Sequence, residues 1–117
     1  MKLITWNVRG MGSGVKCSSI RKLFRIQRVE VAFLQETKKE SITEAEIGRL
    51  WYEDKFEFRA SDASGRSGGL ITIWDKSKFY LEGCIINGRF ILVEGNWIPD
   101  GKRSILMNMY APCNSSE

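Results

Sequence analysis

Two polar side chains stand at the ends of apolar runs, and together they could bind a divalent cation. Asn7 ends an apolar amino-terminal run ahead of a glycine-rich loop, and Glu36 directly follows the apolar run 31–35. If both runs are parallel neighbouring strands, their carboxyl ends lie at one edge of a sheet, about 4.8 Å apart, where open α/β sheets generally bind ligands. A carboxylate beside an amide suits Mg²⁺, which takes few protein carboxylates and completes its shell with water and phosphate oxygens. The pattern therefore predicts a site for Mg²⁺, or for Mn²⁺ in its place, at Asn7 and Glu36.

Each of these residues also has a purely structural interpretation. An asparagine ahead of a glycine loop often bonds its own local backbone, and a glutamate after a strand usually faces water. Tyr110, at the end of the last apolar run, is likewise explained by a half-buried ring whose hydroxyl meets solvent. Only the pairing of Asn7 with Glu36 favours a functional site.

The composition is typical of one soluble globular domain over residues 1–117. Hydrophobic residues make up 43% and charged residues 27%, and 18 Lys and Arg against 14 Asp and Glu give a net charge of +4. This charge is compatible with a polyanionic partner without requiring one. The absence of histidine excludes a Ser-His-Asp site, a Cys-His site and a histidine general base within the chain. Any hydrolysis would have to use carboxylates, tyrosine, lysine or metal-bound water.

Cysteine usage and hydropathy predict an intracellular protein, nuclear or cytoplasmic. Cys17, Cys84 and Cys113 are odd in number and contain no C-x-x-C pair, which favours neither a disulfide framework nor a zinc site. The apolar start is too short for a signal peptide, and no run approaches the roughly 18 apolar residues of a membrane span. We therefore expect no membrane partner.

The elements that must position these residues follow from hydrophobic periodicity. Strands are expected at 2–8 and 31–35, joined by an amphipathic helix that begins after Ser18 or Ser19 as the N-cap. This order implies a right-handed crossover and two parallel strands. A T-x-x-E capping box at 43–46 predicts a second, short helix.

The rest of the sequence is typical of an antiparallel meander. Strands are expected at 56–60, 70–74, 79–86, 89–97 and 104–110. Asn87-Gly88 predicts a two-residue type I′ hairpin, because that turn needs positive φ at both central residues, and residues 98–102 predict a second turn. The expected fold class is α/β (α+β), with a mixed β-sheet and helices on one face.

Four short motifs follow one another along the chain. They are TWNVRG at 5–10, LQETK at 34–38, SGGLITIW at 67–74 and NMYAP at 108–112. In this order they resemble the first half of the endonuclease/exonuclease/phosphatase family, which includes exonuclease III, apurinic endonucleases and deoxyribonuclease I. Their form looks most like the plant LINE-type (non-LTR) retrotransposon endonucleases. The resemblance implies that residues 1–117 are the amino-terminal part of one such domain. They would form the first half of a four-layer α/β/β/α sandwich and supply about one of its two sheets.

The resemblance also implies roles for individual residues. Asn7 would be the active-site asparagine near the metal and the attacking water, and Glu36 would be the metal-binding glutamate. Tyr110 would approach the scissile phosphate, and Arg9 is a further candidate for substrate binding. The implied reaction is Mg²⁺-assisted hydrolysis of phosphodiester bonds in DNA, or in RNA, without a small-molecule cofactor.

The sequence lacks part of the family's pattern. The family carries an Asp-x-Asn motif after the tyrosine and an Asp-His pair near the carboxyl end, and the pair includes the residue that would activate water. We therefore expect a truncated DNA endonuclease that is inactive by itself. Two alternatives stay open, a non-catalytic nucleic-acid-binding module and a remnant whose uncovered sheet face favours aggregation. The basic residues that favour the binding module are Arg9, Lys16, Arg21 and Arg25.

Overall fold

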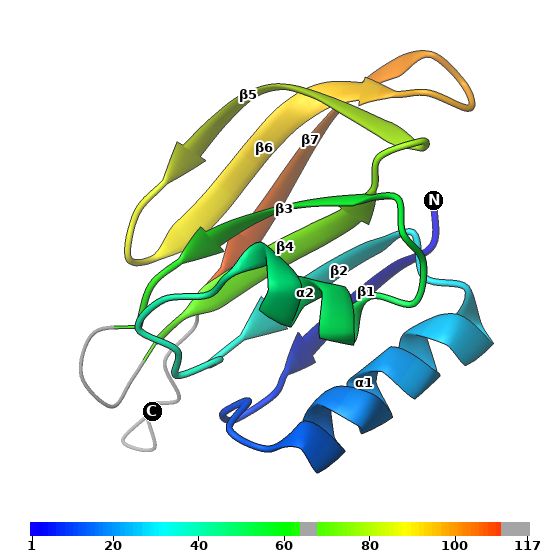
Figure 1. Cartoon of the computed structure of the whole chain (residues 1–117). Coiled ribbons are helices and arrows are strands. Elements are labelled where there is room, and N and C mark those ends of the chain that lie inside the picture. Colours follow the sequence, from blue (N-terminus) through cyan, green and yellow to red (C-terminus); the bar gives the residue numbers. More distant parts are fainter. Residues whose placement is uncertain (64–67, 111–117) are drawn as a thin grey trace, which may run out of the picture.

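The structure, a computed structural model, describes residues 1–63 and 68–110, which form two stacked β-sheets with helices on one side (Figure 1). The elements are β1 (Leu3–Asn7), α1 (Gly14–Gln27), β2 (Val31–Gln35), α2 (Glu44–Leu50), β3 (Phe56–Ser61), β4 (Leu70–Asp75), β5 (Phe79–Ile86), β6 (Phe90–Trp97) and β7 (Lys102–Met109). One sheet has the order β1-β2-β4-β3 and the other the order β5-β6-β7. The predicted mixed class with helices on one face is confirmed. Ser67, Ala111-Pro112 and Cys113, which the sequence analysis names, lie outside the described residues.

The parallel pair that the candidate site requires is present. β1 and β2 pair in parallel, with Leu3 opposite Val31 and Asn7 opposite Gln35, and α1 forms the crossover between them. β4 runs antiparallel to β2, so Leu70 at its amino end lies opposite Gln35. The carboxyl ends of β1 and β2 and the beginning of β4 therefore share one edge of the sheet.

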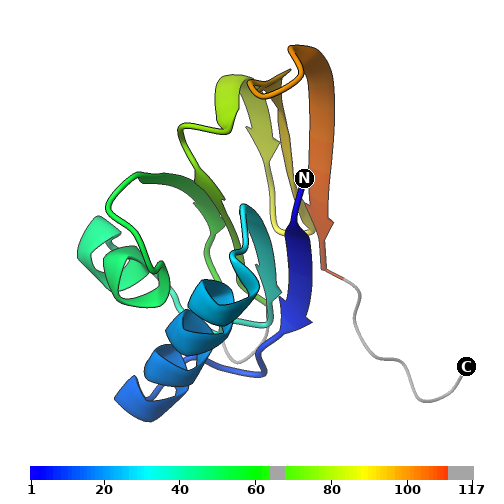
Figure 2. The ribbon, with the colours of Figure 1, turned by 90° about the vertical axis from the view of Figure 1, so that its right-hand side faces the viewer.

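The four-stranded sheet is buried on both faces, which explains the uninterrupted apolar runs of its central strands. On one face, Leu34 and Ile73 belong to a core with residues of α1 and α2. On the other face, Phe33 and Trp74 belong to a core with residues of β5 and β6. Figure 2 shows the resulting layers: the helices pack on one face of the first sheet, and the second sheet lies on its other face. Successive side chains of a strand supply opposite cores because they point to opposite faces.

Helix α1 begins earlier than predicted. Its N-cap is Ser13, which has extended backbone and whose Oγ accepts the N–H of Lys16 at 3.2 Å. Ser18 and Ser19 lie inside the helix, and the Ser19 hydroxyl donates to the carbonyl of Val15 at 3.0 Å. The prediction of a later start was wrong because glycines flank Ser13, and a serine can cap a helix wherever its own backbone is extended.

Helix α2 is confirmed where its capping box predicts it. The Thr43 hydroxyl accepts the N–H of Glu46 at 3.2 Å, and the Glu46 carboxylate accepts the N–H of Thr43 at 3.2 Å. Ile47 and Leu50 are fully buried in the core that α2 shares with the first sheet. The two reciprocal bonds satisfy backbone donors that the first turn leaves without partners.

The hairpin at Asn87-Gly88 is present, but the type I′ turn is not. Neither residue has positive φ, and β6 begins only at Phe90. Instead, the Asn87 Oδ1 atom accepts the backbone N–H groups of Arg89 at 2.9 Å and Phe90 at 3.0 Å. This side-chain turn explains the difference, because asparagine can replace a backbone turn with bonds from its own amide oxygen.

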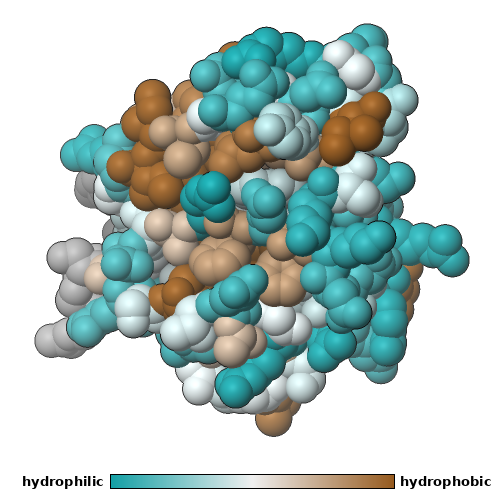
Figure 3. All heavy atoms as spheres, turned by 45° about the horizontal axis from the view of Figure 1, so that its top comes forward, coloured by the Kyte–Doolittle hydropathy of each residue, from teal (hydrophilic) through white to brown (hydrophobic). Residues whose placement is uncertain are grey.

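The meander after β4 forms a sheet of its own, so the chain contains more than the one sheet expected. β7 begins at Lys102, two residues before the predicted start, and ends at Met109. It is an edge strand, as is β1 in the other sheet, and Figure 2 shows the two edges side by side. Hydrophobic side chains gather on the surface of the second sheet (Figure 3). Its exposed hydrophobic residues include Ile85, Ile105, Met107 and Met109.

The remaining expectations concern cysteines and membrane spans. Cys17 and Cys84 are free thiols. Within the described residues, neither helix has the length and the apolar character that crossing a membrane requires.

Candidate functional site

The structure brings Asn7 and Tyr110 to one pocket. It lies between the open edges of β1 and β7 and has a volume of about 470 Å³. Its walls are Leu3, Thr5, Asn7, Phe33, Gln35, Met107, Met109 and Tyr110. Tyr110 is half-buried against the core between the two sheets, and its backbone N–H donates to the Arg89 carbonyl at 2.7 Å. Two of the predicted site residues, far apart in sequence, are thus neighbours in space.

The Asn7 side chain is exposed and also shapes the loop that follows it. Its Oδ1 atom accepts the backbone N–H of Arg9 at 3.1 Å, which is the local bond that a structural interpretation expects. An amide oxygen has two acceptor positions, so this bond leaves one for a metal ion or a water molecule. Arg9 is itself exposed, with a left-handed backbone at φ 52°.

Glu36 directly follows a residue that lines this pocket, Gln35. Gln35 is the partner of Asn7 in the strand register, and the Glu36 carbonyl accepts the N–H of Gly10 at 2.6 Å. The Glu36 side chain is partly exposed and is not among the residues that line the pocket. The meeting of the Glu36 carboxylate with the Asn7 amide therefore stays a prediction.

Left-handed backbone is concentrated at this edge. The residues with positive φ there are Arg9, Gly10, Glu36, Lys38, Gly68 and Gly69. The loops are held together by backbone bonds, from Thr37 N–H to the Gly69 carbonyl and from Met11 N–H to the Thr37 carbonyl, both 3.1 Å. Non-glycine residues in this conformation persist only where the surroundings fix them, and they cluster at functional sites. The concentration of such residues supports a functional role for this edge.

A side-chain network connects the pocket walls at Thr5 and Gln35 with the buried Asn108, and sequence reasoning gave its members no role. Gln35 Nε2 donates to Asn108 Oδ1 at 2.9 Å and to Thr5 Oγ1 at 2.8 Å. Asn108 is fully buried, and its Nδ2 group donates to the Ile71 carbonyl at 3.0 Å. Gln35 and Asn108 belong to the motifs LQETK and NMYAP, so those motifs could have indicated them.

The donors at this edge fit part of a magnesium site. Within residues 1–63 and 68–110, no group of three or more His, Cys, Asp and Glu side chains could hold a metal ion. Mg²⁺ commonly binds through only one or two protein carboxylates, with water and phosphate oxygens completing the octahedron. The carboxylate of Glu36 and the free acceptor position of Asn7 are oxygen donors of the required kind. They would form at most a fraction of the coordination shell.

Comparison with known proteins gives solved structures with the same fold. No family model matches the sequence, and no curated protein matches it. The AP endonuclease LMAP from Leishmania major superposes with a TM-score of 0.68 at 23% identity, over 92% of this chain and 39% of that one. TDP2 from C. elegans gives 0.73 at 16% identity, over 97% and 36%. The Xenopus laevis APE2 catalytic domain gives 0.66 at 15% identity, over 99% and 46%.

These structures are much longer than the region they share with this chain. The chain spans 36% to 46% of their lengths. Because the identities are 23% or less, the likeness establishes the fold alone. The chemistry has to be argued from the side chains at the site. Over nearly its whole length, the chain therefore shares the fold of a part of AP endonuclease LMAP, of TDP2 and of the APE2 catalytic domain.

Proposed function

We propose that this chain is the amino-terminal part of a divalent-metal-dependent endonuclease domain that hydrolyses phosphodiester bonds in DNA. The observation that carries the proposal is the pocket shared by Asn7 and Tyr110, beside Glu36, at the edge where α/β sheets bind ligands. The form of the four motifs supports the retrotransposon type. One structure of similar fold, D. rerio TDP2, is a complex with a single strand DNA product, which supports DNA as the substrate. An intracellular location, nuclear or cytoplasmic, belongs to the same proposal.

In this proposal Glu36 and Asn7 hold the metal, and Tyr110 contacts the phosphate. The bound Mg²⁺ would stabilise negative charge on the phosphate and on the leaving oxygen. Asn7 would hold the metal ion or a water molecule at the free acceptor position of Oδ1 and would donate from Nδ2 to a phosphate oxygen. Arg9 in the exposed loop would contact the DNA strand. Asn108, which is buried behind the pocket, would keep the Gln35 side chain in place in the pocket wall.

We also propose that the chain is inactive by itself. It contains no histidine, and a positioned general base typically contributes about 10² to 10⁴ in rate. The structures of similar fold contain more than twice as much chain, so further groups of a complete site can lie in the part that is not shared. Loss of a base together with other phosphate contacts would lower the rate far below that of a complete enzyme.

Two measurements separate metal binding from activity. Titration of the purified chain with Mn²⁺, followed by electron paramagnetic resonance, should show one weak site that Glu36→Gln abolishes and that Glu40→Gln, a nearby exposed carboxylate, leaves unchanged. Plasmid nicking with Mg²⁺ should show no turnover by the chain. Equal Mn²⁺ binding by the wild type and the Glu36→Gln variant would contradict the metal site. Robust nicking that Glu36→Ala removes would contradict the inactivity.

A non-catalytic nucleic-acid-binding module is the second candidate, and the net charge of +4 favours it. Such a module would bind an oligonucleotide with an affinity that falls steeply as salt rises, because binding releases counterions from the phosphates. Fluorescence anisotropy with a labelled single strand at low salt tests it. The absence of binding there would exclude this candidate.

A further inference from the structure

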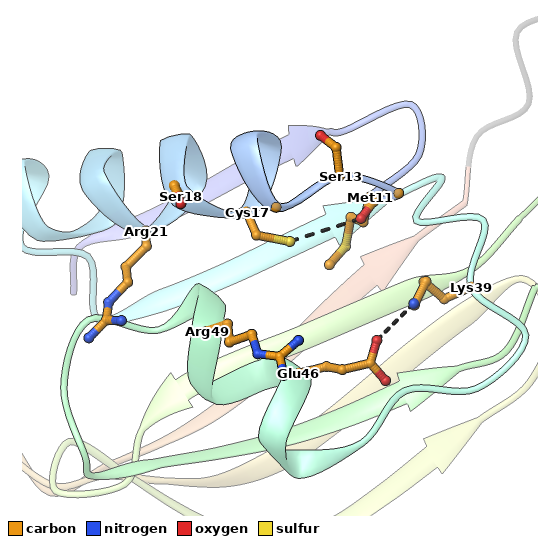
Figure 4. A pocket seen from close by; sticks show the side chains of 10 residues that line it. Met11, Ser13, Cys17, Ser18, Arg21, Lys39, Glu46 and Arg49 are labelled. Atoms are coloured by element: carbon orange, nitrogen blue, oxygen red, sulfur yellow. Dashed lines mark hydrogen bonds and ion pairs between the residues drawn. The ribbon is translucent and has the colours of Figure 1, made fainter.

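A second pocket, of about 380 Å³, lies on the helix side of the first sheet, opposite the pocket of Asn7 and Tyr110, which lies on the side of the second sheet. It is formed between α1 and α2 (Figure 4), and the loop after β1 closes one end. The two pockets have no lining residue in common. Its volume is within the range of about 300 to 1,000 Å³ that small-ligand sites typically have.

Four charged side chains line this pocket, and three of them are cationic. Lys39 and Glu46 form an ion pair with 2.7 Å between Nζ and Oε2, so the single carboxylate already has a cationic partner. Arg21 and Arg49 form no ion pair within the described ranges 1–63 and 68–110. Three cations and one anion leave the walls with a net charge of +2, carried by the two arginines.

The two arginines come from different helices. Figure 4 shows Arg21 extending from α1 at the end of the pocket far from Lys39, and Arg49 extending from α2 on the side of Glu46, between Arg21 and the Lys39–Glu46 pair. The hydroxyl groups of Ser13 and Ser18 also line the walls. A guanidinium group presents a planar set of N–H donors that matches the oxygens of a phosphate and binds them in pairs. Two guanidinium groups and hydroxyl groups around one cavity suit a tetrahedral oxyanion.

We propose that the pocket between α1 and α2 binds a phosphate group through Arg21 and Arg49. The phosphate can belong to a small molecule, such as inorganic phosphate or a nucleotide, or to the backbone of a nucleic acid. Asn7, Glu36 and Tyr110 do not line this pocket, so the inference does not rest on the proposed nuclease site. Both arginines are exposed, so the affinity should fall as the ionic strength rises.

Nuclear magnetic resonance titration of the ¹⁵N-labelled chain tests the proposal. Inorganic phosphate, added at constant ionic strength, should shift the backbone amide signals of Ser13, Cys17 and Ser18 with one saturating curve. The double variant Arg21→Gln/Arg49→Gln should weaken this binding by about tenfold or more, because two charge-assisted contacts are lost. A preserved amide spectrum of the variant in the absence of phosphate establishes that it is folded.

A matched control separates a defined site from diffuse charge. Lys22→Gln/Arg25→Gln removes two positive charges from α1 outside the pocket and should leave the phosphate affinity unchanged. Equal weakening by both double variants, or no saturating shift in the wild type, would overturn the proposal. Glu36→Gln should bind phosphate like the wild type, so failure of the metal site and failure of this site are distinguishable.

Two further titrations identify the source of the phosphate. With a nucleoside monophosphate and with a short single-stranded oligonucleotide, the same amide signals should shift and the same double variant should lose affinity. Tighter binding of the monophosphate assigns the pocket to a small molecule, and tighter binding of the oligonucleotide assigns it to a nucleic-acid backbone. An oligonucleotide that binds without moving these signals, while phosphate also leaves them unmoved, would refute the site.

Discussion

The Nε2 group of Gln35 on β2 donates to Oδ1 of Asn108 on β7 at 2.9 Å, and this bond joins the two sheets. Asn108 is fully buried and donates onward to the Ile71 carbonyl and the Thr72 hydroxyl of β4. A buried amide is tolerated because its polar groups are paired, and the pairing fixes one arrangement of the sheets. The position of Gln35 in the wall of the candidate site therefore depends on a polar contact with a fully buried residue.

Replacement of Asn108 should destabilise the fold. Asn108→Ala removes one acceptor of the Gln35 amide and the side-chain donor to the Ile71 carbonyl and the Thr72 hydroxyl, and a buried polar group that loses its partner costs about 1 to 3 kcal/mol. Urea unfolding followed by tryptophan fluorescence measures the change. Asn96→Ala, on the neighbouring strand at a half-exposed position, is the matched control and should change the stability by less than about 0.5 kcal/mol. Equal losses for both variants would show that the network contributes nothing specific.

A side chain at Gly69 should disturb the edge that carries Glu36. Gly69 has φ 93°, and a Cβ there would collide with the Thr37 hydroxyl. Gly69→Ala should therefore lower the free energy of unfolding by about 1 to 3 kcal/mol, through left-handed strain and displacement of the loop. Gly88→Ala is the control, because that position has ordinary φ and open space around it. Thermal unfolding by circular dichroism should separate the two variants, and similar midpoints would contradict the steric argument.

Local signals in the sequence predicted the elements best. The capping box at Thr43 and Glu46 and the apolar run of β2 depend on neighbouring residues, and both are confirmed. The start of α1 at Ser13 and the type of the turn at Asn87 were predicted wrongly, because each depends on a side-chain bond that several nearby residues could make. Sequence reasoning can recognise such residues but cannot choose among them.

The candidate site was predicted in part. The parallel pairing of β1 with β2 follows from the strand-helix-strand order and is confirmed, and the structure adds the register, with Asn7 opposite Gln35. The pairing of Gln35 with Asn108 connects residues 73 positions apart and crosses between sheets, and hydrophobic periodicity carries no information on such a contact. The separation of the meander into its own sheet was missed for the same reason, since strand order alone does not decide which edges pair.

The Lys39–Glu46 pair should make stability depend on pH. The hydrogen bond from Lys39, followed by the backbone bond from Thr43, lowers the pKa of Glu46 below its ordinary value of 4.5. A carboxylate with a lowered folded-state pKa contributes stability above its unfolded-state pKa, and this contribution is lost as the pH falls through the folded value. The pair is partly exposed, so we expect a contribution of only about 0.2 to 1 kcal/mol at pH 7.

The variant Glu46→Gln tests this linkage. The difference in unfolding free energy between the wild type and the variant should be present at pH 7 and shrink as the pH falls below about 4.5. Lys39→Gln should reduce the same pH-dependent difference, because it removes the partner. Urea unfolding at several pH values measures it, with Glu40→Gln as an exposed carboxylate control. A difference that is constant from pH 7 to pH 3 would show that the ion pair is not its cause.

The edge strand β7 should make the chain associate with itself at high concentration. Ile105 is 63% exposed on this strand, which has a partner on only one side in the second sheet. Unpaired backbone groups beside exposed apolar side chains favour strand-to-strand association, and a lysine at an edge opposes it. Sedimentation velocity should show mass rising with concentration for the wild type and a monomer for Ile105→Lys. Ile26→Lys changes an isoleucine of 61% exposure on α1 and should associate like the wild type. If both lysine variants suppress association equally, added charge is responsible and the β7 edge is not.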